Sequence, residues 1–127
     1  MNAQEIMNTI ALGLFEQGCC CAGYDEEDAG MVPQYRNKYG QKCAIGFLMT
    51  EEGLATAESV WPLSRIISEG FVEYMEKEEY RLARAWQHTH DSLVYKVLDH
   101  EKFIEVLREE SASIAARFGL VDPLVEI

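Results

Sequence analysis

Basic residues are scarce in this chain. Its 127 residues include 11 Lys and Arg against 22 Asp and Glu, which gives a net charge of −11. Proteins that hold nucleic acid on a basic surface need Lys and Arg to replace the counterions of the phosphates. The composition therefore disfavours direct nucleic-acid binding and favours a protein partner that has a basic surface.

Long apolar runs are also missing, and no stretch approaches the length of a membrane span. The moderately apolar segment Ile6–Phe15 is preceded by Glu5 instead of Lys or Arg, so we expect no export signal and no membrane partner. The apolar fraction of 48% is enough for a proper core, and the length suits one domain over residues 1–127. These features predict a cytoplasmic protein.

The cysteines lack the spacing of a disulfide framework or a zinc site. Cys19, Cys20 and Cys21 are consecutive, and Cys43 stands alone. Neighbouring cysteines form badly strained bridges, and a zinc-binding pair usually has two residues between its cysteines. Glycine-rich phosphate loops, nucleophile elbows, HExxH motifs and calcium loops are absent as well. We therefore predict no metal and no cofactor.

Apolar residues at three- and four-residue spacing predict several helices. One covers Ala3–Gln17, a second runs from Phe71 to about Asp91, and a third begins after Asp99 and ends at Gly119. A shorter helix is expected to begin at Ala44. The sequence thus predicts an α+β, mostly α fold: a small helical domain with one short β-hairpin.

The non-helical segments are predicted from glycine, proline and turn residues. Residues 34–44 are predicted to form the hairpin, with its turn at Asn37–Gly40. Residues 19–33, which contain the acidic cluster Asp25–Asp28, are predicted to be an irregular loop. Residues 120–127 are predicted to be an extended tail, because Pro123 prevents a continuing helix.

Cys43 is the residue with the clearest catalytic interpretation. A thiol at the start of a helix and beside Lys42 has a lowered pKa and becomes a nucleophile. It also needs a base, for which His90 is a candidate, and an orienting group, for which Asp91 is a candidate. Adjacent residues on a helix do not face each other, so Asp91 would orient His90 only if the helix ended there. The alternative is that Cys43 is a packed, inert side chain.

Acidic residues and aromatic residues suggest a second kind of site. Glu101, Glu105 and Glu109 form a stripe of like charge at four-residue spacing, which costs helix stability and favours a face that meets a basic partner. A solvated helix face is the alternative. Exposed aromatic side chains would serve as anchors. The candidate binding residues are Tyr35, Arg36, Lys42, Trp61, Glu73 and Glu76.

The segments "YRNKYGQKCAIGFLM", "LARAWQHTHD" and "ARFGL" resemble a group of small phage and prophage proteins of uncharacterised activity. The resemblance covers about a quarter of the chain and implies a phage context and a host-cell cytoplasm. Phe47 occupies a position where relatives often have a cysteine, and the cysteine that often precedes the tyrosine is also missing, which weakens a shared zinc site. The matching positions are Tyr35, Arg36, Gly40, Lys42, Cys43, Ala44, Ile45, Gly46, His90 and Asp91.

Three functional hypotheses follow from these observations. The first is an acidic phage-type accessory protein that binds a host or phage protein, for example one that handles nucleic acid or acts in defence. The second is a cysteine-dependent hydrolase or transferase that uses Cys43, His90 and Asp91. The third is a structural homo-oligomer.

Overall fold

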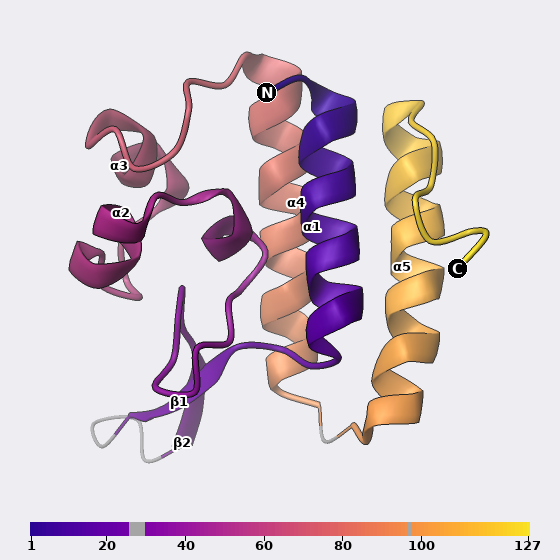
Figure 1. Ribbon diagram of the computed structural model, residues 1–127, viewed down its shortest axis with the longest axis horizontal. Helices are drawn as coiled ribbons and strands as arrows, with labels where there is room; N and C mark the ends of the chain where they lie inside the picture. Colours follow the sequence, from indigo (N-terminus) through magenta and orange to yellow (C-terminus); the bar gives the residue numbers. More distant parts are fainter. Residues whose placement is uncertain (26–29, 97) are drawn as a thin grey trace.

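The protein is described by a computed structural model that covers residues 1–25, 30–96 and 98–127. Its frame consists of three long helices, α1 (Ala3–Gln17), α4 (Lys77–Val94) and α5 (His100–Phe118), which pack on one another. Helices α1 and α4 run in the same direction and α5 runs in the opposite one (Figure 1). The shorter elements lie on the side of α1 and α4 that is remote from α5. The predicted α+β, mostly α fold class is confirmed.

The ends of α1 and α5 follow from side-chain caps. The Asn2 side chain accepts a hydrogen bond from the backbone of Glu5, and Gly18 ends α1 in the left-handed conformation with φ 75°. Asp99 accepts from the Lys102 N–H at 2.8 Å, and Gly119 ends α5 with φ 67°. Both helices were predicted with these ends.

Helix α4 begins at Lys77, so the predicted start at Phe71 is wrong. The reason is a pair of reciprocal hydrogen bonds between Glu76 and Glu79, which caps the first turn. Val72 and Met75 are buried as predicted, but they lie in a non-helical segment before the helix. The helix also extends beyond Asp91 to Val94.

The hairpin lies earlier in the chain than predicted. Strands β1 (Ala22–Asp25) and β2 (Gly30–Pro33) pair antiparallel, with Ala22 opposite Pro33, inside the segment predicted to be a loop. Residues 34–44 form only the isolated bridge between Arg36 and Lys42. The Asn37 side chain accepts hydrogen bonds from the N–H groups of residues 39 and 41, which closes a tight turn instead of a ladder. Most of the acidic cluster, residues 26–28, lies outside the described residues.

Three short elements and the tail complete the fold. They are the 3-10 helix η1 (Ile45–Leu48), α2 (Glu51–Thr56) and α3 (Leu63–Ser68), so the helix predicted from Ala44 is short and α3 was missed. The predicted extended tail is also wrong. Residues 123–126 form a turn, because the Asp122 carboxylate accepts from the Leu124 N–H and Leu124 is buried against the helices.

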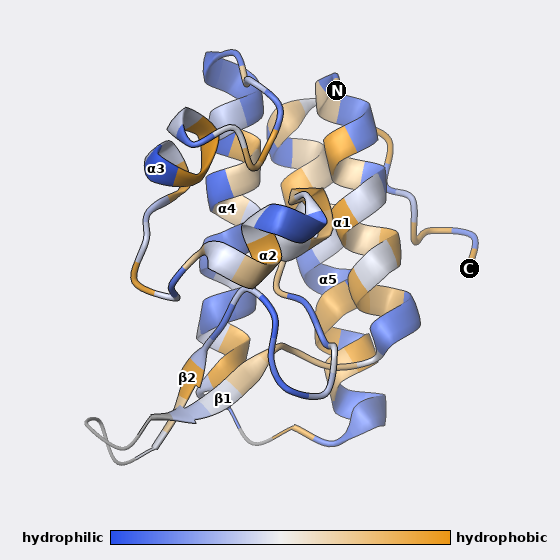
Figure 2. Ribbon diagram, turned by 60° about the vertical axis from the view of Figure 1, so that its left-hand side comes forward, coloured by the Kyte–Doolittle hydropathy of each residue, from blue (hydrophilic) through white to orange (hydrophobic). Residues whose placement is uncertain are grey.

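The core lies between the helices and is centred on Trp86. Its indole is fully buried and donates a hydrogen bond to the Met7 sulfur at 3.2 Å. In Figure 2 the long helices carry both hydrophobic and hydrophilic residues, as expected for amphipathic helices that pack side by side. In the part of the chain that the structure describes, no helix combines the length and apolar character needed to cross a membrane.

Candidate functional site

The motif around Cys43 is a tightly packed corner. The Cys43 N–H donates to the Tyr35 carbonyl at 3.1 Å, and the Cys43 sulfur accepts from the Gly46 N–H at 3.3 Å. A Cβ atom at Gly46 would lie 2.4 Å from the Tyr35 carbonyl oxygen, so only glycine fits there. The lysine–cysteine–alanine–isoleucine–glycine pattern therefore has a packing explanation.

The predicted lowering of the Cys43 thiol pKa is wrong. Its side chain is fully buried, and burial raises the thiol pKa far above its usual range. The helix that follows is a single 3-10 turn, and Lys42 does not compensate for the loss of water around the sulfur. The burial agrees with the alternative interpretation from the sequence, in which Cys43 is a packed side chain.

His90 is also buried, and both of its ring nitrogens have partners. Nε2 accepts a hydrogen bond from the Cys21 N–H at 2.9 Å, so Nδ1 carries the proton of the neutral ring and donates to Asp91 Oδ1, also at 2.9 Å. Asp91 reaches His90 although α4 continues to Val94, which corrects our expectation for adjacent residues. With both nitrogens engaged, His90 is not placed to serve as a base for Cys43.

The other three cysteines are free thiols near the start of the hairpin. The Cys20 sulfur donates to the His90 carbonyl at 3.7 Å, and the Cys21 sulfur donates to the Gln41 carbonyl at 3.0 Å. Burial raises the pKa of Cys20 to about 12 and that of Cys21 to about 11. These thiols are therefore protonated hydrogen-bond donors near neutral pH.

Two of the predicted binding residues, Tyr35 and Trp61, are held against each other. The buried Tyr35 hydroxyl donates to the Trp61 carbonyl oxygen. The Arg65 guanidinium lies 3.6 Å from the centre of the Trp61 ring. Trp61 is thus half-buried and stacked on a cation within the molecule.

The remaining predicted binding residues are dispersed. Arg36 pairs with Glu51, and this ion pair lowers the pKa of the Glu51 carboxyl. The Lys42 backbone is held on both sides by the Gln17 side chain. Exposed Glu73 lies 3.3 Å from the chain's amino terminus, and exposed Glu76 caps α4. The structure does not bring these four residues into one site.

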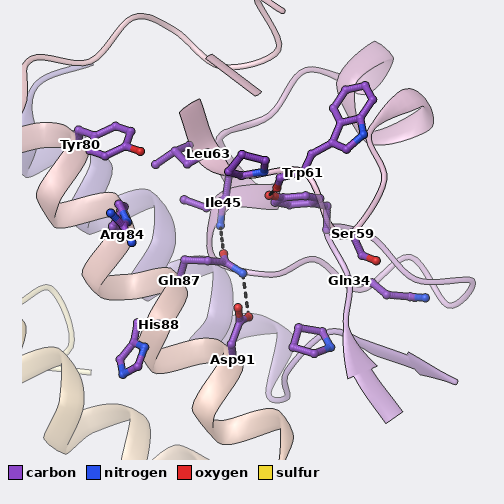
Figure 3. A pocket seen from close by; sticks show the side chains of 13 residues that line it. Gln34, Ile45, Ser59, Trp61, Leu63, Tyr80, Arg84, Gln87, His88 and Asp91 are labelled. Carbon is purple, nitrogen blue, oxygen red and sulfur yellow. Dashed lines mark hydrogen bonds between the residues drawn. The ribbon is translucent and has the colours of Figure 1, made fainter. Parts of the chain in front are cut away.

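A cavity of about 410 Å³ does bring together three predicted site residues, namely Tyr35, Trp61 and Asp91. It lies between one face of α4 and the segment that leads into α3 (Figure 3). Sequence reasoning did not group the other polar residues of α4 that line the cavity with Asp91. Their signal is the three- and four-residue spacing that leads back from Asp91 along one helix face: Gln87 and His88, Arg84 and Tyr80.

The Asp91 carboxylate is held in this cavity by a chain of hydrogen bonds. The Ile45 N–H donates to Gln87 Oε1 at 3.0 Å, and Gln87 Nε2 donates to Asp91 Oδ1 at 2.8 Å (Figure 3). His90 donates to the same oxygen. Within the described part of the chain, Asp91 Oδ2 has no hydrogen-bond partner, and the side chain is 38% exposed. The arrangement is an oriented carboxylate with one oxygen free for a ligand.

Comparison of this chain with protein-family models, with curated proteins and with solved structures finds no match.

Proposed function

We propose that this protein acts by binding a partner protein that has a basic surface. The observation that supports the proposal most strongly is the acidic stripe, defined as Glu101, Glu105 and Glu109 on α5. All three residues are exposed. Among the described residues, Lys102 forms an ion pair with Glu105 alone, at 3.3 Å, so the stripe keeps most of its negative charge.

The rest of the surface adds to this charge. Across the described residues, Lys and Arg side chains pair with only three acids, Glu51, Glu78 and Glu105. These pairs are exposed and contribute little to stability. Like charges at four-residue spacing destabilise a helix, so the stripe has a cost that a binding role would offset. The resemblance to phage and prophage proteins favours a host or phage protein as the partner.

Attraction between exposed charges weakens when salt screens them. Wild-type protein is therefore expected to bind a labelled peptide rich in Lys and Arg, with an affinity that falls about tenfold or more between about 50 mM and about 300 mM NaCl. Fluorescence anisotropy measures this directly, with a peptide of the same length rich in Asp and Glu as the reference.

A pair of variants distinguishes the contribution of the stripe to affinity from the contribution of net charge. The stripe variant replaces Glu101, Glu105 and Glu109 with Gln, and the control variant replaces three exposed acids outside α5, Glu5, Glu16 and Glu58, with Gln. Both variants lose the same charge, and the stripe variant is expected to lose several-fold more affinity. Equal losses, or binding that does not respond to salt, would contradict the proposal.

A further inference from the structure

The cavity beside α4 lies away from the acidic stripe and has features of its own. One end holds the oriented carboxylate of Asp91. Arg84, which is exposed, lines the cavity farther along α4, with its guanidinium 6.0 Å from the centre of the Tyr80 ring, and His88 is a further lining residue. Arg84 and Asp91 are separated by seven helical residues, or about 10 Å along the axis. Groups of opposite charge therefore occupy the two ends of one cavity.

Neither charged end is neutralised by the protein itself. Among the residues that the structure describes, Arg84 forms no ion pair or hydrogen bond, and Asp91 Oδ2 accepts none. Asp91 is held by the neutral Gln87 side chain and by the imidazole of His90, so its negative charge is not cancelled by Lys or Arg. A ligand would have to bring a cation to one end and an anion to the other.

Part of the cavity wall is suited to an aliphatic chain. Ile45, Leu63 and Pro62 line the cavity with apolar atoms, and Tyr35 lines it as well. The volume of about 410 Å³ is in the range of small-molecule pockets and is close to the lower end of it. Methylene groups of a ligand would lie on this wall while the charged groups reach the two ends.

We propose that this cavity binds a small zwitterionic group, with a guanidinium or ammonium at Asp91, a carboxylate at Arg84 and a short aliphatic spacer between them. Free arginine or lysine carries these groups, and so does a peptide that ends in either residue. Arg84 offers its two-pronged guanidinium to the carboxylate, and His88 adds a second donor. Asp91 Oδ2 accepts from the cationic group of the ligand.

The test is calorimetric titration of the full chain with L-arginine and L-lysine, with agmatine, which lacks the carboxylate, and with L-norvaline, which lacks the guanidinium. The tripeptide Gly-Gly-Arg separates a peptide terminus from a free amino acid as the source of the group. L-Arginine or the tripeptide is expected to bind. A ligand that lacks either the carboxylate or the guanidinium is expected to bind about tenfold or more weakly.

Two variants test which charged group of the ligand binds at Asp91 and which binds at Arg84. Asp91→Asn keeps an oxygen that accepts from Gln87 and His90, so the fold is retained, and it is expected to weaken L-arginine binding about tenfold or more. Arg84→Gln should do the same for L-arginine but should leave agmatine unaffected, because agmatine has no carboxylate for Arg84 to bind. Glu16→Gln on α1 and Arg117→Gln on α5 change exposed residues outside the cavity and are the charge-matched controls, and neither should change the affinity.

Absence of binding by all three basic ligands, L-arginine, L-lysine and Gly-Gly-Arg, would overturn the proposal. Binding that persists unchanged in Asp91→Asn would do so too. Neither result affects the stripe, whose test uses salt and the α5 substitutions.

Discussion

Iodoacetamide is expected to modify Cys43 at least about a hundredfold more slowly than Cys19 in the folded protein near pH 8. The thiolate is the reacting species, and burial raises the Cys43 thiol pKa far above its ordinary value of 9.0. Cys19 is half-buried, and burial raises its pKa less than that of Cys20. The Cys43 sulfur is therefore both inaccessible to the reagent and held in the unreactive thiol form.

Mass spectrometry after timed labelling measures the two rates. Trypsin cuts after Lys42 and Arg65, so Cys43 is recovered in a peptide separate from Cys19–Cys21. Labelling in denaturant is the control, because unfolding should make the rates similar. Faster modification of Cys43 than of the other three thiols in the folded protein would restore the cysteine-dependent hydrolase or transferase hypothesis.

His90→Ala is expected to reduce the free energy of unfolding by about 3 kcal/mol. The substitution leaves a void at a buried position and removes the acceptor of the Cys21 N–H, which then has no partner away from water. It also releases Asp91 from one of its two donors. Urea unfolding followed by circular dichroism measures the change.

The matched control is His88→Ala, which makes the same change on the same helix at an exposed position. Its effect should stay within about 0.5 kcal/mol. If the two variants lost equal stability, the buried hydrogen bonds assigned to His90 would be wrong.

The elements predicted best are those whose ends are encoded locally. Asn2 and Gly18 bound α1, and Asp99 and Gly119 bound α5, so the pattern and the caps agree. The start of α4 was misplaced because the apolar spacing of residues 72 and 75 continues across the boundary. The cap formed by Glu76 and Glu79 decides that boundary.

The hairpin was misplaced because strand preference depends on packing partners more than on local sequence. Residues 34–44 contain good turn chemistry, but the Asn37 side chain uses the backbone donors that a ladder would need. Residues 22–25 and 30–33 have weak strand signals, yet they pair with each other and β2 packs against α4.

The candidate site was predicted in part. The sequence singled out Tyr35 and Trp61 as binding residues and Asp91 as an orienting group, without indicating that all three line one cavity. It left open whether Cys43 is reactive or packed, and it did not reveal that Cys21 uses the second nitrogen of His90, because both facts depend on long-range contacts. Arg84 was missed because only the opposing segment makes that face of α4 part of a cavity.

The orientation of Asp91 in the cavity depends on His90, which joins the start of the hairpin to α4 and donates to the Asp91 carboxylate. A long-range ¹H–¹⁵N correlation spectrum of the histidine rings tests it most directly. The hydrogen bonds to Cys21 and Asp91 predict that Nδ1 of His90 is protonated and that Nε2 is not. A proton on Nε2 would contradict the account, because that nitrogen would no longer accept from the Cys21 N–H.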